Sequence, residues 1–270
     1  MAELEPYERS CQDAISRCLT KYKKHKNTFI VDIGCSFNSW FLNYPFLGLL
    51  IDYDIKKILG IPNTNLYTKL IKKITPFNVC NVLKEYNVPK EFLCLNLDTD
   101  GYDLFTLIAL LKQYSPKIII TEINEKLPYP VKFSIKYDPD FEWGWCHLYG
   151  YSIACLEDVM KMFNYSIDSL NYNNIILIKN DEGETPNIDK IKQFYEDGYL
   201  NNKVVPPPGW NDDVKHLHEC KTKEEVAKKW REYFINNPNP NNGLPQTKNL
   251  DKYVINDAYE IYLQEFLKTI

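Results

Sequence analysis

The sequence predicts an α/β protein: a doubly wound, mostly parallel seven-strand sheet with an antiparallel closing strand, plus an α-helical C-terminal extension. Three observations lead to this fold class. Short apolar runs alternate with helical stretches, nearly every early run ends in a carboxylate, and the character of the chain changes after residue 180. Alternation of strand and helix at this spacing is typical of a parallel sheet that is covered by helices on both faces.

The predicted strands are short apolar runs, and most are followed directly by polar residues. The first five are expected at 29–31, 46–52, 68–74, 92–98 and 116–122. Two further runs, at 164–170 and 173–180, are separated by a short turn and are expected to form the antiparallel pair that closes the sheet.

The helical stretches divide the chain into three parts. Residues 1–27 are expected to form an N-terminal helix with an apolar face made of Cys11, Ile15, Cys18 and Leu19. Within the predicted sheet domain, 28–180, helices are expected at 75–88 and 103–114. The remainder, 181–270, begins with linker-like sequence and predicts helices at 221–236 and 252–268, which would cover the active-site edge of the sheet.

Composition excludes several classes of function. The chain has 270 residues, 44% of them hydrophobic, and a net charge of -4, which offers no general attraction to nucleic acid or to an anionic membrane. No apolar run approaches the roughly 20 residues that a transmembrane helix needs. The polar N-terminus does not resemble a signal peptide, and the 8 cysteines show no zinc-binding spacing. We therefore expect a soluble protein of the reducing cytoplasm.

Polar residues at the strand ends indicate a site, because ligands of doubly wound sheets bind at the carboxyl ends of the strands. These residues come from four strands and are Asp32, Gly34, Asp52, Asp98, Asp100, Asp103, Glu122 and Asn124. An acid that closes the second strand can accept hydrogen bonds from both hydroxyls of a ribose. For each acid taken alone, capping of the following helix is the alternative, and for Asp52 or Asp54 the two interpretations are equally good.

The first β-to-α turn, "DIGCSFNS", limits the choice of cofactor. A pyrophosphate needs several backbone N–H groups that glycines bring close, and this turn supplies only Gly34. S-adenosylmethionine (SAM) has a ribose and an adenine but no phosphate. Its amino and carboxylate groups could be met by Asp32 or Asp98 and by the backbone around Gly34 and Cys35.

Several motifs, taken in order, resemble a known family. "VDIGCSFNSWFL…GLLIDYD" resembles the first two motifs of the class I, seven-strand SAM-dependent methyltransferases. "LNLDTDGYD", "PKIIITEIN", "KYDPDFEW" and "YGYSIACLEDV" follow in the order of an FkbM-like branch, over residues 28–180. The chain departs from that pattern at Cys35, Phe37 and Asn38 in the first loop, and "LNLDTD" replaces a more regular acidic motif.

The resemblance implies roles for individual residues. Asp32, Gly34 and Asn38, with Cys35 and Ser39 in the same loop, would bind the methionine end of SAM. Asp52 and Tyr53 would hold the ribose, and Asp98 would lie beneath the methyl group. Catalysis would fall to residues that face the acceptor, namely Asp100, Glu122 and His147. The aromatic loop 141–152, which carries His147, would arch over the acceptor, although packing alone explains Trp143 and Trp145 equally well.

The predicted function is therefore methyl transfer from SAM to an oxygen or nitrogen of a small polar acceptor, such as a sugar or another metabolite. His147 is the first choice of base because a free imidazole titrates near neutral pH. The alternative is a methyltransferase fold without catalysis, acting as a binding or scaffold module. An RNA methyltransferase is disfavoured by the net charge.

Asp98, Asp100 and Glu122 are expected to converge at the ends of adjacent strands. Three close carboxylates repel one another, so either one of them keeps a proton or a hard cation such as Mg²⁺ lies among their oxygens. The alternative is local: Asp100 would cap the next helix and Glu122 would bond to the backbone.

Overall fold

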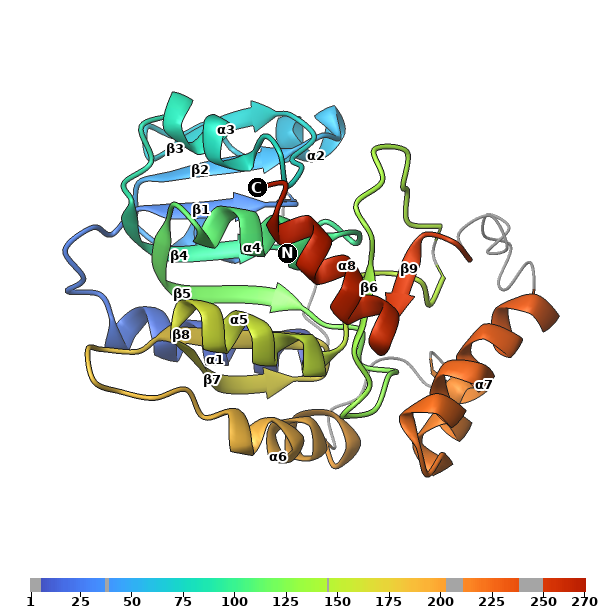
Figure 1. Cartoon of the computed structure of the whole chain (residues 1–270). Helices are drawn as coiled ribbons and strands as arrows, with labels where there is room; N and C mark the ends of the chain where they lie inside the picture. The colour runs from blue at the N-terminus through green and yellow to red at the C-terminus, as the bar shows by residue number, and fades with distance from the viewer. Residues whose placement is uncertain (1–5, 37–38, 145, 203–210, 238–249) are drawn as a thin grey trace.

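A computed structural model describes residues 6–36, 39–144, 146–202, 211–237 and 250–270 of the protein. Its centre is a seven-strand sheet in the order β3-β2-β1-β4-β5-β8-β7 (Figure 1). The strands are β1 (Ile30–Ile33), β2 (Gly48–Asp52), β3 (Tyr67–Ile71), β4 (Glu91–Leu97), β5 (Ser115–Glu122), β7 (Tyr165–Asn171) and β8 (Asn174–Lys179).

The pairing of the strands is mostly parallel. β1 to β5 pair in parallel, whereas β8 runs antiparallel to both β5 and β7. The β7–β8 hairpin turns through Tyr172, which adopts a left-handed conformation with φ of 60°. The predicted fold class and the predicted closing pair are confirmed, and the antiparallel strand lies next to the edge strand β7.

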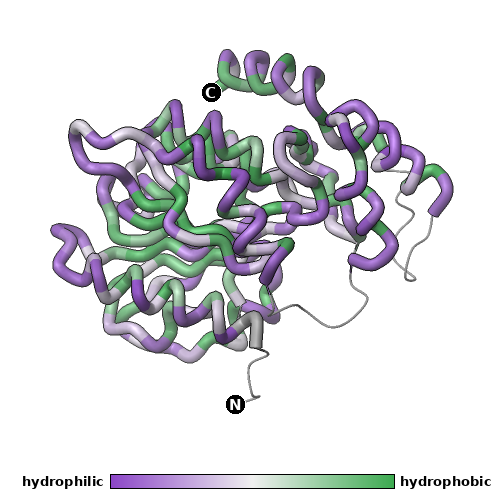
Figure 2. The backbone as a smooth tube through the Cα atoms, turned by 90° about the horizontal axis from the view of Figure 1, so that it is seen from below, coloured by the Kyte–Doolittle hydropathy of each residue, from purple (hydrophilic) through white to green (hydrophobic). Residues whose placement is uncertain are grey.

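Helices cover both faces of the sheet because its central strands are apolar on both sides. β1 and β2 are buried along their whole length. One face packs against α3 (Val79–Glu85), α4 (Asp103–Leu111), α5 (Leu156–Phe163) and α8 (Asp257–Leu267). The other face packs against α1 (Pro6–Lys21) and α2 (Ile55–Gly60). Figure 2 shows the same layering, with hydrophobic strands inside and hydrophilic outer surfaces on the helices.

The N-terminal helix buries the face that the sequence predicts, with Cys11, Ile15, Cys18 and Leu19 each at most 4% exposed. The helix ends at Lys21, however, so most of the basic run up to Lys26 lies in the turn beyond it. Cations at that end of a helix interact favourably with its dipole, and nothing further is needed to explain them.

The C-terminal extension is not purely helical, which corrects the prediction of one helix over 252–268. Its first residues form β9 (Tyr253–Ile255), which pairs antiparallel with β6 (Phe133–Ile135), and α8 begins only at Asp257. The aromatic and β-branched run "YVI" suits a strand. The region after residue 180 also contains α6 (Ile191–Tyr195) and a π-helical turn (Glu196–Leu200), which follow the first linker-like stretch.

The rest of the extension packs beyond the carboxyl ends of the strands (Figure 1). α7 (Lys223–Asn236) buries Trp230 and Phe234 against residues 127–148, and a 3-10 helix (Asp212–Glu219) joins the same cluster. Within the described residues, no helix is both long and apolar enough to cross a membrane.

Candidate functional site

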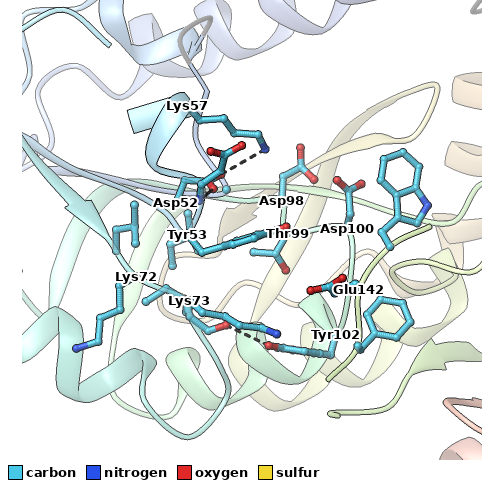
Figure 3. A pocket seen from close by; sticks show the side chains of 18 residues that line it. Asp52, Tyr53, Lys57, Lys72, Lys73, Asp98, Thr99, Asp100, Tyr102 and Glu142 are labelled. Carbon is cyan, nitrogen blue, oxygen red and sulfur yellow. Dashed lines mark hydrogen bonds and ion pairs between the residues drawn. The ribbon is translucent and has the colours of Figure 1, made fainter. Parts of the chain in front are cut away.

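A cavity of about 500 Å³ lies at the carboxyl ends of the parallel strands (Figure 3). The strand order reverses between β1 and β4, and doubly wound sheets bind ligands at this point. Residues from the ends of β1, β2 and β4 line the cavity, together with the loop after β3 and the segment 141–143. The polar and aromatic lining residues are Asp52, Tyr53, Asp54, Lys57, Lys72, Lys73, Asp98, Thr99, Asp100, Tyr102, Phe141, Glu142 and Trp143.

The end of β2 presents Asp52 to this cavity. The residue is only 4% exposed, and its carboxylate accepts a hydrogen bond of 2.6 Å from the backbone N–H of Asp54. The ammonium of Lys57, one turn into α2, lies 3.4 Å from the other carboxylate oxygen. Asp54 is the helix cap, since its side chain accepts from the backbone N–H of Lys56 at 2.8 Å. The two acids therefore have different tasks: both line the cavity, but Asp54 caps α2 whereas Asp52 closes β2.

The first turn is held by Asp32, which lies behind the cavity and does not line it. Asp32 is buried, and its carboxylate accepts hydrogen bonds from Ser39 Oγ and, at 2.8 Å, from Asn96 Nδ2. Burial raises the pKa of Asp32 to about 6 in spite of these bonds. Cys35 is buried in the core behind the turn. Only Gly34 of this turn reaches the cavity lining in the described part of the chain.

The turn after β4 is shaped by Asp103. Its carboxylate accepts hydrogen bonds from the backbone N–H groups of Thr99 and Gly101, both at 2.9 Å, and from Thr99 Oγ1 at 2.6 Å. Asp100 sits inside this turn with φ of 55°. The sequence-based alternative in which Asp100 caps the helix is wrong, because the N-cap of α4 is Tyr102 and, in the described part of the chain, no side-chain hydrogen bond caps the helix. The Asp100 carboxyl instead lines the cavity.

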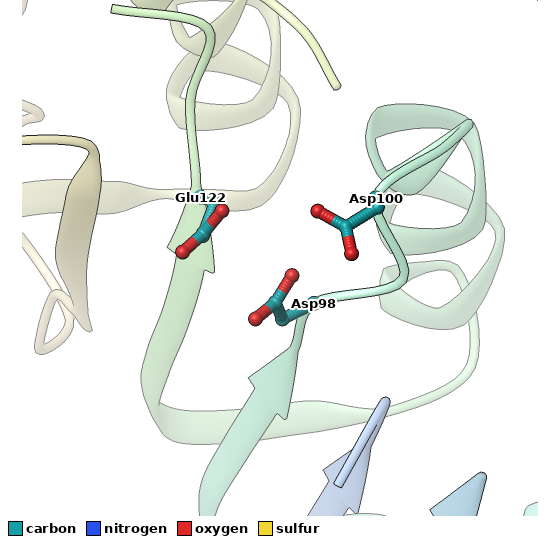
Figure 4. Close-up of side chains that lie close together, drawn as sticks. All are labelled: Asp98, Asp100 and Glu122. Atoms are coloured by element: carbon teal, nitrogen blue, oxygen red, sulfur yellow. The ribbon is translucent and has the colours of Figure 1, made fainter. Parts of the chain in front are cut away.

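Asp98, Asp100 and Glu122 converge, as the sequence predicts (Figure 4). One carboxylate oxygen from each lies within 4.8 Å of the others. Burial, reinforced by the neighbouring carboxylates, raises the pKa of Asp98 well above its ordinary value, that of Asp100 to about 6 and that of Glu122 to about 8. These shifts favour a proton held within the cluster when no cation lies among its oxygens.

The carboxylate oxygens are also ligands that a hard cation accepts, so the set fits Mg²⁺ as well as a shared proton. Asn174 Nδ2 lies 3.5 Å from Glu122 Oε1, a weak contact that leaves Glu122 available to either arrangement. A backbone bond to the Glu122 side chain, the local alternative, is not formed in the described part of the chain.

The segment 141–143 supplies the aromatic side of the cavity. Phe141 is buried against Gly101, and Trp143 donates its indole N–H to the carbonyl of Cys146 at 2.8 Å. Glu142 is exposed and adds a further carboxylate to the lining. Trp145 and Asn38, both named from the sequence, lie outside the described residues.

His147 does not line the cavity. It is 7% exposed, and its Nε2 lies 3.2 Å from each carboxylate oxygen of Asp213 in the C-terminal extension. Tyr233 of α7 donates its hydroxyl hydrogen to the same carboxylate. These contacts hold the pKa of Asp213 at about 2, against the effect of its partial burial. The geometry makes His147 a tether between the 141–152 loop and the extension.

The extension contacts that loop, among other segments near the site, through Asp213. None of its described residues lines the cavity, although the sequence predicts that it helps to define the pocket. A second contact joins the extension to the start of the loop: the Lys252 ammonium lies 3.2 Å from the Asp138 carboxylate.

Sequence reasoning missed several lining residues, chiefly Lys57, Thr99, Tyr102 and Glu142. Lys57 could have been found, because it stands one turn into the helix that follows Asp52 in "IDYDIKKIL". Thr99 and Tyr102 lie within the acidic motif that the sequence did single out, but they carry no charge to mark them.

Among known proteins, the chain resembles several solved structures at low sequence identity. No family model matches the chain, and no curated protein matches its sequence. Similar solved structures include magnesium protoporphyrin IX methyltransferase from Synechocystis PCC 6803 with bound SAH (S-adenosylhomocysteine), at 11% identity, a TM-score of 0.43 and coverage of 64% of this chain and 84% of that one.

N-methyltransferase NodS from Bradyrhizobium japonicum WM9 is similar at 12% identity and a TM-score of 0.36, with coverage of 64% of this chain and 93% of NodS. MycE methyltransferase from the mycinamycin biosynthetic pathway, in complex with Mg and SAH, has 14% identity and a TM-score of 0.34, and the alignment covers 65% of this chain and 50% of MycE. At these identities and TM-scores, the similarities identify neither an acceptor nor a reaction.

Proposed function

We propose that the protein transfers a methyl group from SAM to an oxygen or nitrogen of a small polar acceptor. The observation that carries this proposal is that Gly34 and Asp52 line the same cavity. That cavity lies where the strand order of the sheet reverses, between β1 and β4. Asp52 closes the second strand, where its carboxylate can accept the hydrogen bonds of two ribose hydroxyls.

The charge of the cavity favours this cofactor over a dinucleotide. The lining carries five carboxyl groups, on Asp52, Asp54, Asp98, Asp100 and Glu142, and three lysines, on positions 57, 72 and 73. Lys57 is paired with Asp52, and Lys73 donates to the carbonyl of Pro139 at 2.6 Å. The excess of acid attracts a sulfonium and an α-amino group and repels a pyrophosphate.

When bound, SAM supplies a methyl group on a sulfonium sulfur. Asp98 and Gly34 would hold the methionine end of the cofactor, and Asp52 with Tyr53 would hold its ribose. Asp100 would orient the acceptor and take its proton as the bond between the acceptor atom and the methyl carbon forms. The bond between that carbon and sulfur breaks, and its electron pair remains on sulfur. A carboxyl with a pKa of about 6 is ionised at neutral pH and can act as this base.

Glu122 would support Asp100 by sharing the proton of the cluster. The alternative, in which Mg²⁺ neutralises the three carboxylates and orients an acceptor hydroxyl, rests on the same oxygens. Turnover that survives an excess of chelator would exclude the metal. The FkbM-like branch rests on the sequence motifs alone.

The competing function is that of a binding module without catalysis, favoured by the single glycine of the first turn. The assay that separates the two measures SAH release from SAM with a panel of small hydroxyl and amine acceptors. We expect turnover by the wild type and a large loss of turnover in Asp100→Asn. The control variant Asp140→Asn, which alters an exposed carboxylate on the neighbouring loop, should turn over as fast as the wild type. Saturable SAM binding without turnover across the panel would favour the binding module.

A further inference from the structure

A fully buried ion pair follows β5, outside the cavity just described. The side chains of Glu125 and Lys126 are both 0% exposed, and Lys126 Nζ lies 2.8 Å from Glu125 Oε1. Burying two charges costs about as much as their attraction returns, so an apolar pair of similar size would stabilise the fold equally well. Its stability contribution does not explain the pair.

Glu125 collects hydrogen bonds from three separate segments of the chain. Tyr149 donates at 2.6 Å, Tyr172 of the β7–β8 turn at 3.0 Å, and Asn211 of the extension at 2.8 Å. Burial alone would raise the pKa of Glu125, but the Lys126 ammonium and the hydrogen bonds from Tyr149 and Asn211 hold it below its ordinary value. Glu125 is therefore an ionised group at which the sheet edge, the aromatic loop and the extension meet.

The same pair leads to the cavity through Tyr149. Lys126 Nζ lies 2.8 Å from the Tyr149 hydroxyl and 4.4 Å from the centre of its ring. The Tyr149 ring makes an edge contact with Trp143, with ring centres 6.0 Å apart, and Trp143 lines the cavity. Asn124 fixes the loop backbone by donating to the carbonyls of His147 and Tyr149 at 2.8 and 3.0 Å.

We propose that Glu125 and Lys126 are positioning residues for the acceptor end of the cavity: through Tyr149 they hold the loop 141–149 in the arrangement that places Trp143 against the acceptor. This inference rests on the proposed function for the meaning of that arrangement. It also gives the C-terminal extension a role, because Asn211 donates to the same carboxylate.

The test compares two variants that each lose one buried tyrosyl hydroxyl. Tyr149→Phe removes the bonds to the ion pair but keeps the ring beside Trp143. Tyr165→Phe is the matched control, because its hydroxyl donates to the carbonyl of Pro116 at the opposite end of the sheet. Two signals are measured. The first is amide hydrogen exchange of residues 141–149. The second is acrylamide quenching of the Trp143 fluorescence, which is identified as the part of the emission that is lost in Trp143→Phe.

In Tyr149→Phe we expect severalfold faster exchange in 141–149 and stronger quenching of Trp143, with SAH affinity unchanged. Tyr165→Phe should leave both signals as in the wild type. Equal signals in the two variants would overturn the inference. If Tyr149→Phe does not fold, Asn211→Ala, which removes the donor that the extension gives to Glu125, must show the same two changes for the inference to stand. Failure of the wild type to bind SAH would contradict the proposed function and leave the loop measurements as an independent result.

Discussion

A methyl group placed on Gly34 would come within 1.6 Å of the carbonyl oxygen of Asp98. The turn after β1 therefore passes directly against the end of β4, and only a glycine permits the contact. Gly34 also has φ of 87°, a conformation that other residues rarely adopt. The close approach brings together the two strand ends between which the cavity opens.

We predict that Gly34→Ala destabilises the fold by several kcal/mol and abolishes SAH binding, because both strain and collision must be relieved. Gly183→Ala is a matched control: Gly183 has φ of 89°, but a methyl group there would have nothing within 4 Å. It should cost only the strain of the left-handed conformation, roughly 1–2 kcal/mol. Chemical denaturation measures both values, and equal losses in the two variants would show that the contact with Asp98 is unimportant.

His147 is predicted to be structural. His147→Gln should lower the free energy of unfolding by about 1 kcal/mol, the usual value of a hydrogen bond, and should leave SAH affinity unchanged. His216→Gln serves as the control, because it alters a partly exposed histidine of the same 3-10 helix, whose Nδ1 lies 3.1 Å from the Asp213 carbonyl oxygen. It should leave SAH affinity unchanged and change the free energy of unfolding by no more than about 0.5 kcal/mol, the usual range of surface substitutions. If His147→Gln loses turnover while amide hydrogen exchange in residues 141–149 is unchanged, the histidine is the base and this prediction is wrong.

The acidic cluster predicts that the protein loses stability as pH rises. The pKa of Asp100 rises from its ordinary 3.8 to about 6 and that of Glu122 from 4.5 to about 8, mainly through burial. The folded state therefore binds more protons than the unfolded state between pH 4 and pH 8, and the free energy of unfolding falls as pH rises across this window.

Urea denaturation at several pH values should show this slope in the wild type and a much weaker one in the double variant Asp100→Asn, Glu122→Gln. The control, Asp140→Asn, should keep the wild-type slope. A slope that is the same in all three proteins would mean that the cluster does not hold the proton.

Much of the fold could be predicted because its information is local. The strand runs, the helix after Asp103 and the closing β7–β8 pair each depend on the pattern of a short segment. β9 was missed because its partner, β6, lies far earlier in the chain, and a three-residue strand leaves almost no periodic signal.

The candidate site divides in the same way. The cavity is lined by Gly34, Asp52 and Asp98. These residues could be predicted because the carboxyl ends of parallel strands meet at one edge of the sheet, independently of the loop conformations. The contact of His147 with Asp213 could not be predicted, because the two residues lie far apart in the chain. The bonds of Asp103 to the turn are local, but the sequence "DTDGYD" offers three acids for them. No local pattern distinguishes Asp100 from Asp103, since either could accept the N–H groups of that turn.

The central claim is that Asp52 holds the ribose of SAM, and titration calorimetry with SAH tests it most directly. We predict saturable binding at one site in the wild type and in Asp140→Ala. In Asp52→Ala the affinity should fall by roughly 1.5–3 kcal/mol, the value of a lost hydrogen bond to a charged group. No saturable heat with the wild type at millimolar SAH would contradict the account, as would equal affinity in the wild type and Asp52→Ala.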